Sequence, residues 1–420
     1  MAISHERQQP KLSDGIDFYK PTMSQIEFLN HPNEQVVFTF KNRGKEKLVQ
    51  NVDTETLQNR LDEYQKGFGE DEIEYLGTRL GQGDKPLFDP EYLEYLRDRE
   101  LPTIEVTIDP ETEDVAITAS GDWPMVTFWE TVVMSEVNEL YFETKIAEEG
   151  LDIMEIYEEG DRRLTEKIEI LQSRPDIKFA DFGTRRRFSY RWHNHVVERL
   201  VNECPENMLG VSCVGLANEH GVDPIGTFAH EMFMVYAALA DAEGKNPLEG
   251  HNKVLRDWRD GYGDDLSTAL TDTFGSEFFF TDMTLEQAKE WRALRHDSGD
   301  PYDFGDRVIE FYEDKGIDPM EKTIVFSDGL DIDTIVQLTD YFKGRINVVF
   351  GWGTTLTNDL GLKPLNIVMK ATKVNDTDTV KLSDVEGKHT GPQEKVELYQ
   401  KEVAVALGAT ANKQALKELA

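Results

Sequence analysis

The feature that most limits the possible folds is a strand-then-helix pattern that repeats between about residue 135 and residue 360. Short apolar runs end in small or charged residues, and helical periodicity follows each run. Repeated strand–helix units predict parallel β-strands. Seven strands are more than a small sheet needs, so the pattern favours an irregular TIM-like α/β barrel over an open sheet. The seven runs are residues 178–182, 208–213, 224–226, 267–270, 293–295, 323–326 and 346–350.

The N-terminal third has a different pattern, in which a helix is followed by strands that pair as antiparallel hairpins rather than by repeated strand–helix units. The turn between its last two strands is a Pro-Glu-Thr-Glu sequence, which is typical of a hairpin. This region is therefore expected to be an α+β domain. The helix is predicted at residues 21–29, and the three strands at residues 35–41, 103–108 and 114–119.

The C-terminal segment also predicts antiparallel structure. Residues 365–370 and 380–382 flank an Asn-Asp-Thr turn, and their alternating hydropathy predicts a second hairpin. We expect this tail to return to the N-terminal domain. The predicted organisation is an α+β N-terminal sandwich domain, residues 1–134, completed by residues 361–420, with an α/β barrel domain at residues 135–360.

The composition excludes several classes of partner. Lys and Arg total 45 against 81 Asp and Glu, and the resulting net charge of −36 repels nucleic-acid phosphates and anionic membranes. No stretch approaches the ~18 to 20 apolar residues of a membrane span. The two cysteines, Cys204 and Cys213, fit neither a disulfide framework nor a CxxC metal site. We therefore expect a cytoplasmic protein without nucleic-acid or membrane partners, in which a cluster of cations marks a pocket for anionic substrates.

Two of the predicted barrel loops have the residues of a phosphate site. Residues 351–355 (GWGTT) combine glycines, which let backbone amides approach an anion, with hydroxyl donors. Residues 327–329 (SDG) follow the neighbouring strand, and adjacent loops of this kind commonly hold phosphate in barrels. Each stretch taken alone is also compatible with an ordinary tight turn, and Asp328 with a helix cap.

Charged groups follow several other strands. Residues 295–301 (RHDSGDP) place a cation and two carboxylates in one loop, either to bind a ligand or to form a capped turn with an internal ion pair. Residues 185–187 are three arginines, of which one or two can face a single ligand. His230 begins a predicted helix, where an anion is favoured, although a lone histidine is more often structural.

Together these segments resemble the nicotinate phosphoribosyltransferase family, within the type II phosphoribosyltransferase fold. The resemblance runs from about residue 14 to residue 388 in a single order. It is carried by DFYKPTM at 17–23, FKNRG at 40–44, DFGTRRR at 181–187, PIGTFAHE at 224–231, LTDTFG at 270–275, LRHDSGDP at 294–301, VFSDGLD at 325–331, FGWGT at 350–354, KPLNIVMK at 363–370 and KLSD at 381–384.

The resemblance implies an activity and its substrates. Such an enzyme forms nicotinate mononucleotide and diphosphate from nicotinate and 5-phosphoribosyl 1-diphosphate, in NAD biosynthesis. ATP is expected as a co-substrate and Mg²⁺ as a cofactor, and His230 is expected to become a phosphohistidine. A homodimer is also implied. No residue is assigned as a dedicated metal ligand.

The resemblance further assigns the groups that bind nicotinate. Tyr19 and Phe182 are expected to sandwich the pyridine ring, with Tyr19 coming from the same or a neighbouring subunit. Arg185 and Arg295 are expected to hold the carboxylate, with Ser212 nearby. Residues 210–213 (GVSC) depart from a GTSN-like stretch frequent in the family, so only the serine of that stretch keeps its expected role.

The remaining assignments concern the phosphoribosyl group. Asp272 and Asp297, together with His230, are the expected catalytic residues, and the two carboxylates should face the ribose and the diphosphate with its Mg²⁺. Arg43 is expected to reach diphosphate or ATP across a dimer. The groups expected to hold the 5′-phosphate are Gly329, Gly353 and Thr354.

Two alternatives stay open at this point. One is a phosphoribosyltransferase for nicotinamide or quinolinate, which the pair of arginines and the ordered motifs disfavour. The other is a non-catalytic barrel that binds a phosphosugar.

Overall fold

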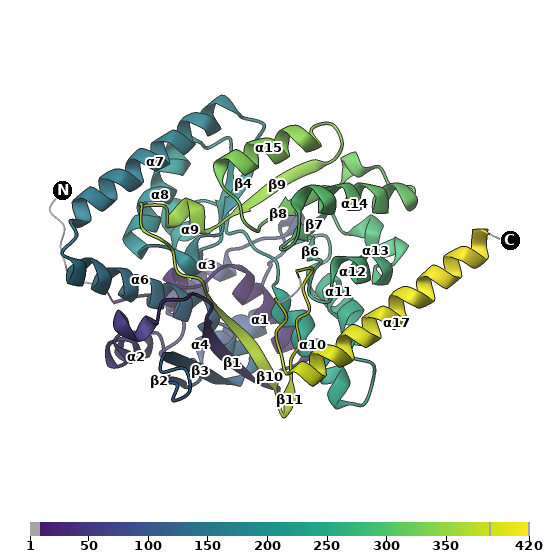
Figure 1. Ribbon diagram of the computed structural model, residues 1–420, viewed down its shortest axis with the longest axis horizontal. Coiled ribbons are helices and arrows are strands. Elements are labelled where there is room, and N and C mark those ends of the chain that lie inside the picture. The colour runs from purple at the N-terminus through teal and green to yellow at the C-terminus, as the bar shows by residue number, and fades with distance from the viewer. Residues whose placement is uncertain (1–8, 386–387, 419–420) are drawn as a thin grey trace.

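The computed structural model describes residues 9–385 and 388–418 and contains two β-sheets (Figure 1). The parallel sheet has the strand order β5-β4-β9-β8-β7-β6 and forms the predicted α/β barrel. The other sheet is antiparallel, with the order β11-β10-β1-β3-β2. The strands are β1 Gln35–Asn42, β2 Ile104–Ile108, β3 Val115–Asp122, β4 Phe179–Asp181, β5 Met208–Val211, β6 Thr268–Leu270, β7 Ala293–His296, β8 Thr323–Phe326, β9 Asn347–Trp352, β10 Ile367–Val374 and β11 Thr377–Asp378.

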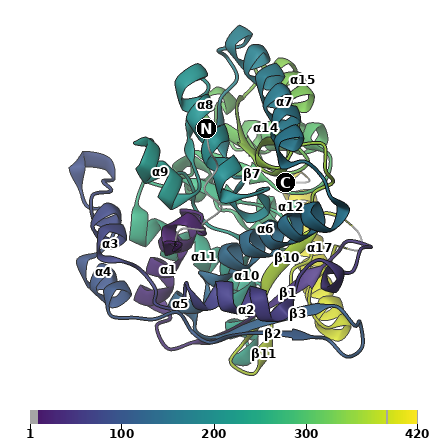
Figure 2. The same cartoon turned by 90° about the vertical axis from the view of Figure 1, so that its left-hand side faces the viewer.

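Helices cover both sheets. Figure 2 shows the antiparallel sheet at the lower end of the molecule and the barrel helices α7, α8, α14 and α15 at the upper end. One hydrophobic core runs through both parts. The helices are α1 Tyr19–Asn30, α2 Thr54–Asp62, α3 Glu70–Gly77, α4 Pro90–Arg97, α5 Trp123–Val126, α6 Trp129–Glu149, α7 Ile153–Ser173, α8 Tyr190–Glu203, α9 Val214–His220, α10 His230–Ala242, α11 Glu249–Tyr262, α12 Ser276–Asp282, α13 Leu285–Glu290, α14 Pro301–Asp314, α15 Ile332–Phe342, α16 Thr354–Thr357 and α17 Gln393–Glu418.

The prediction of a seventh barrel strand at residues 224–226 was wrong. This segment forms a single bridge, between Pro224 and Val211, and lies between the edge strands β5 and β6. Ile225 donates its backbone N–H to Val211 at 2.9 Å, and Thr227 Oγ1 bonds the carbonyl of Thr268 in β6 at 3.1 Å. Proline has no N–H for a sheet ladder, which explains why the segment spans the gap without becoming a strand.

The C-terminal segment returns to the antiparallel sheet as predicted, because β10 pairs with β1 from Ile367 to Val374. The second strand of its hairpin was predicted at 380–382 but is β11, at Thr377–Asp378. The left-handed backbone of Asn375, with φ of 49°, turns the chain early. Residues 379–384 then leave the sheet and approach the barrel loops.

The last helix was expected to follow the tail onto the N-terminal domain. Instead, the Tyr399 ring of α17 packs 5.7 Å from the Phe274 ring, next to α12. Figure 1 shows α17 projecting from the body on the side of α10 to α13. The predicted boundaries between the domains stay predictions. Within the described residues, no helix combines the length and the apolar character of a membrane span.

Candidate active site

The loops that follow the barrel strands meet at two adjoining cavities. The barrel cavity has a volume of about 600 Å³, and the His230 cavity has a volume of about 200 Å³. Loops at the carboxyl ends of barrel strands are where such folds place their sites. The cavities share the residues Tyr19, Phe182, Arg185, Arg186, Arg295, Ser327 and Asp328.

Two aromatic rings line both cavities. Phe182 directly follows β4, and Tyr19 is the first residue of α1. Glycines let both rings approach the barrel: a Cβ at Gly226 would lie 2.6 Å from the Tyr19 backbone nitrogen, and one at Gly351 would touch the Phe182 ring at 3.4 Å. Both rings come from one chain, so a second subunit is not required to bring them together.

Arg185 lies in the 3-10 helix Thr184–Arg186, above the Tyr19 ring. Its nearest acidic neighbours are Asp17 at 3.6 Å and Glu130 at 3.7 Å, both beyond hydrogen-bond distance. Within the described chain its guanidinium makes no hydrogen bond, so its N–H groups are available to a ligand. The guanidinium therefore suits a carboxylate, which it can bind bidentately.

Arg295, the second residue predicted to bind the carboxylate, already makes hydrogen bonds within the protein. Its guanidinium bonds Ser327 Oγ at 2.8 Å and Asp297 Oδ1 at 2.9 Å. Arg187, by contrast, is 1% exposed and donates to the carbonyl of Asp14. Of the three consecutive arginines, two therefore line the cavities and the third is structural, which agrees with the sequence-based expectation.

Ser212, expected near the carboxylate, does not line either cavity. Its side chain is fully buried and donates to Asp17 Oδ1 at 2.6 Å. The backbone explains this orientation, because Ser212 N–H bonds the carbonyl of Asp181 in the neighbouring strand β4. Ser212 thus orients Asp17, the acidic neighbour of Arg185, and its hydroxyl also lies 3.4 Å from that of Thr184.

The predicted phosphate residues line the barrel cavity. Gly329 has a left-handed backbone, with φ of 63°, which a residue with a side chain rarely adopts. Gly353 and Thr354 open the short helix α16, and Ser327 and Thr355 add hydroxyl groups nearby. Glycines and hydroxyls of this kind suit an anion.

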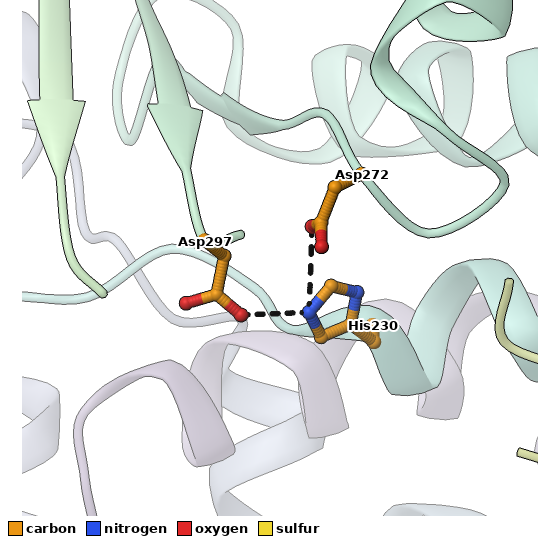
Figure 3. Close-up of side chains that lie close together, drawn as sticks. All are labelled: His230, Asp272 and Asp297. Carbon is orange, nitrogen blue, oxygen red and sulfur yellow. Dashed lines mark hydrogen bonds and ion pairs between the residues drawn. The ribbon is translucent and has the colours of Figure 1, made fainter. Parts of the chain in front are cut away.

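His230 is the first residue of α10, and its imidazole points toward Asp272 and Asp297 (Figure 3). Its side chain is 14% exposed. Its Nδ1 lies 2.9 Å from Thr273 Oγ1, and its Nε2 lies 2.9 Å from Asp297 Oδ2 and 3.6 Å from Asp272 Oδ1. Burial lowers the pKa of His230 to about 4, and the positive charge of Lys381 contributes to the lowering. The imidazole is therefore neutral at pH 7.

The two aspartates stay ionised despite their surroundings. Burial opposes ionisation of Asp297, but Arg295 and His230 outweigh it and hold the pKa of Asp297 well below its ordinary value. Asp272 is 1% exposed, and its Oδ1 has no hydrogen-bond partner within the described residues. Ligand atoms of His230 and both carboxylates lie within 4.8 Å of one another. An unpartnered buried carboxylate oxygen beside a second carboxylate fits a hard divalent cation such as Mg²⁺.

The sequence analysis gave no individual role to three cations that line the His230 cavity, namely Arg186, Lys370 and Lys381. Burial lowers the pKa of Lys370 to about 7, and Lys381 and Arg43 contribute to the lowering. Arg43, Arg186 and Lys370 form no ion pair within the described part of the chain. Unpaired cations in a protein of net charge −36 indicate a site for a polyanion. The sequence did offer a signal for the two lysines, because Lys370 ends the motif KPLNIVMK and Lys381 begins the motif KLSD.

Arg43 reaches the His230 cavity of its own chain, where it is exposed. The expectation that it acts across a dimer is therefore not needed to place it at the site.

A buried charge network supports both the ring pocket and His230. Lys20 follows Tyr19 and is fully buried, with its Nζ 2.6 Å from Glu130 and 2.7 Å from Glu231. Glu231 follows His230, so the first turns of α1 and α10 are joined through one ammonium group. This network fixes the relative positions of the two predicted functional residues.

Comparison with known proteins gives consistent matches. The model of the "Nicotinate phosphoribosyltransferase (NAPRTase) family" matches residues 177–407, and that of its N-terminal domain matches residues 15–138. The chain is 38% identical over 398 residues to a nicotinate phosphoribosyltransferase of Chromobacterium violaceum, covering 92% of this chain and 95% of the relative. It is 38% identical over 396 residues to one of Methanosarcina mazei, covering 90% and 94%. A solved nicotinate phosphoribosyltransferase from Porphyromonas gingivalis superposes with a TM-score of 0.85 at 30% identity, covering 94% of this chain and 100% of that one.

Proposed function

Because the chain belongs to the nicotinate phosphoribosyltransferase family, we propose that it joins nicotinate to the ribose of 5-phosphoribosyl 1-diphosphate. The products are nicotinate mononucleotide and diphosphate, a step of NAD biosynthesis. The observation that carries the proposal is that one pair of cavities holds two rings, an unengaged arginine and a phosphate cradle. The key residues are Tyr19, Phe182, Arg185, Gly329 and Gly353.

The arrangement suits a loose transition state. The pyridine nitrogen of nicotinate is already a nucleophile, so the protein needs to orient the ring rather than activate it. The rings of Tyr19 and Phe182 hold the pyridine, and Arg185 with Arg295 binds its carboxylate. As diphosphate leaves, positive charge develops on the ribose, and the ionised Asp297 lies where it can stabilise that charge. Mg²⁺, held by Asp272 and Asp297, would neutralise charge on the leaving diphosphate.

We further propose that ATP phosphorylates His230 and that this step drives the reaction. Three observations support it: the imidazole is neutral, it opens into a cavity, and unpaired cations line that cavity. A neutral imidazole has a free lone pair for phosphoryl transfer. Arg43, Arg186 and Lys370 are placed to receive the phosphates of ATP or the diphosphate.

The substrate assignment is tested by turnover with nicotinate, nicotinamide and quinolinate side by side. Nicotinate should be used at least about 100-fold more efficiently than the uncharged amide, because two arginines face one carboxylate. An equal or faster rate with nicotinamide or quinolinate would refute the assignment. Absence of turnover with all three, combined with binding of phosphoribosyl diphosphate, would favour the non-catalytic phosphosugar-binding barrel.

The phosphohistidine is tested with γ-³²P-labelled ATP. The wild-type protein should become labelled, whereas His230→Ala should not, and the variant should lose ATP-stimulated turnover. His195→Ala is a matched control, since this histidine lies 2.9 Å from Asp161 outside both cavities. Unchanged ATP-stimulated turnover in His230→Ala would contradict the proposal.

The cytoplasmic location and the homodimer are proposals as well. Tyr19 lines both cavities and Arg43 lines the His230 cavity, all within one chain, so the proposed dimer is not needed to bring these two residues to the site. Light scattering coupled to size-exclusion chromatography gives the oligomeric state directly. Fractionation of the source cells tests the location.

A further inference from the structure

The short helix α16 lies between two of the loops that build the site. Its first residue, Thr354, is expected to hold the 5′-phosphate together with Gly353, which precedes it. Its last residue, Thr357, and the next residue, Asn358, have no assigned role and line neither cavity. Both are buried, with exposures of 0% and 1%. One turn of helix therefore separates the predicted phosphate group from two buried polar side chains.

These two side chains hold the arginine turn, which is the 3-10 helix Thr184–Arg186. Thr357 Oγ1 donates to the carbonyl of Gly183 at 3.0 Å. Asn358 Nδ2 donates to the carbonyl of Arg186 at 2.8 Å. The two carbonyls lie on either side of the arginine that is proposed to bind nicotinate, so the end of α16 fixes the turn at two points.

The two segments also pack closely. A Cβ at Gly183 would lie 2.2 Å from Thr357 Oγ1, so only a glycine permits this approach. Backbone hydrogen bonds continue the contact, because Phe188 N–H donates to the carbonyl of Thr357 at 3.1 Å and Phe182 N–H to the carbonyl of Trp352 at 2.8 Å. A displacement of α16 would therefore displace the arginine turn.

Asn358 joins the two ends of this connection. Its backbone N–H donates to the carbonyl of Thr354 at 2.8 Å, and its side chain bonds Arg186. Its Oδ1 is buried and has no hydrogen-bond partner within the described residues. A helix of four residues is unstable by itself, so the order of α16 depends on what its two ends contact.

We propose that Thr357 and Asn358 are positioning residues that couple the two subsites, so that a bound 5′-phosphate strengthens the binding of nicotinate. This inference rests on the proposed function. A phosphate at Gly353 and Thr354 would order α16, and the hydrogen bonds at its other end would hold Arg185 in place before nicotinate binds. Nicotinate then has less ordering to impose, which raises its affinity. Because coupling between two sites is reciprocal, nicotinate should strengthen phosphate binding by the same factor.

The coupling is measured by calorimetric titration of nicotinate without and with ribose 5-phosphate. This compound supplies the 5′-phosphate but no diphosphate, so no reaction occurs, and the titration needs neither ATP nor a metal ion. Saturating ribose 5-phosphate should lower the Kd of the wild type for nicotinate by about 5- to 20-fold, within the usual range of coupling between sites. Saturating nicotinate should lower the Kd for ribose 5-phosphate equally.

Two variants break the connection at different points. Thr357→Val removes the hydroxyl that bonds Gly183, and Asn358→Ala removes the amide that bonds Arg186. In each variant the coupling factor should fall below about twofold. Thr357→Ser keeps the hydroxyl and should keep the wild-type factor. A purely structural role would lower the melting temperature without changing this ratio of two dissociation constants.

Matched controls remove similar groups elsewhere. Thr339→Val loses a buried hydroxyl that bonds the carbonyl of Ile335 in α15. Asn207→Ala loses a buried amide that bonds the carbonyl of Arg174, near the amino end of β4 and away from the barrel loops. Both controls should keep the wild-type coupling factor, and circular dichroism checks that every variant is folded.

The possible failures are distinguishable. A wild type that binds both ligands without mutual effect overturns this inference and leaves the proposed function standing. A folded Thr357→Val or Asn358→Ala with the wild-type factor overturns it as well. A wild type that binds no ribose 5-phosphate, or no nicotinate even in its presence, refutes the proposed function and this inference with it.

Discussion

Arg185→Met is expected to remove most of the preference of the enzyme for a carboxylate on the pyridine ring. The guanidinium has no hydrogen-bond partner in the described chain, and its nearest acidic oxygens lie 3.6 and 3.7 Å away. A bound carboxylate would receive two charged hydrogen bonds, each contributing about 1.5 to 3 kcal/mol. Because Arg295 still supplies one cation, we take the lower end. About 3 kcal/mol corresponds to a roughly 100-fold rise in the KM for nicotinate.

The substitution also affects stability, and this effect has to be separated from binding. Asp17 Oδ2 is buried without a hydrogen-bond donor, so Arg185 supplies its compensating charge. At 3.6 Å and an effective dielectric constant of about 20, the attraction is roughly 4 to 5 kcal/mol. The double variant Asp17→Asn/Arg185→Met removes the uncompensated carboxylate. It should recover part of the lost thermal stability but none of the nicotinate affinity.

The assay is steady-state kinetics with saturating phosphoribosyl diphosphate and ATP, together with calorimetric titration of nicotinate and nicotinamide. Nicotinate should lose affinity by about 100-fold, whereas nicotinamide should change by less than about threefold, because the amide carries no charge to lose. Arg185→Lys keeps the charge without the bidentate fork and should fall between wild type and Arg185→Met. An unchanged KM for nicotinate, or an equal loss for both compounds, would refute the role of Arg185.

Three further predictions concern the supports of the site. Lys20→Met removes the ammonium that pairs with the buried Glu130 and Glu231, so the free energy of unfolding, measured in urea titrations, should fall by about 3 to 5 kcal/mol. The control Lys373→Met changes an exposed lysine and should not lower it. Equal unfolding curves for the two variants would contradict the buried network. Gly226→Ala places a Cβ 2.6 Å from the Tyr19 backbone nitrogen, so it should displace Tyr19 and raise the KM for nicotinate. The control is Gly408→Ala, whose added Cβ would have no atom within 4 Å. A wild-type KM in Gly226→Ala would show that the Tyr19 position is not critical. His230 has a folded pKa of about 4, below its ordinary 6.5, so the unfolded chain binds its proton first as the pH falls. Metal-free protein should therefore lose about 3 kcal/mol of stability between pH 6.5 and 4, and His230→Asn should flatten that part of the curve; parallel curves would refute the shift.

Much of the fold follows from local sequence patterns. Six of the seven predicted barrel strands are present, because a short apolar run followed by a helix is decided by neighbouring residues. The exception, at residues 224–226, depends on a contact from elsewhere, since Gly226 packs against Tyr19. The hairpin partner at 380–382 failed for a similar reason, because those residues bond Thr273 and His230 rather than the sheet.

The candidate site was predictable where residues share a loop or a motif. Arg185, Arg295, Asp297 and the phosphate glycines were named from the sequence, and the structure brings them to two adjoining cavities. Ser212 follows β5, and the sequence alone did not show that its side chain bonds Asp17 rather than lining a cavity. Lys370 lies in the apolar strand β10, and its place at the end of the motif KPLNIVMK was the one sign that it could line a cavity.

The sequence by itself determined the strand–helix repeat, the excess of acidic residues and the order of the motifs, because each is a property of neighbouring residues or of composition. Only the tertiary structure decided the surroundings of His230. Thr273, Asp297 and Lys381 come from three loops separated from one another along the chain by between 24 and 108 residues, yet each lies 2.9 Å from the imidazole. Which group orients a side chain depends on distances of a few ångströms, and those distances are fixed by the packing of the whole chain.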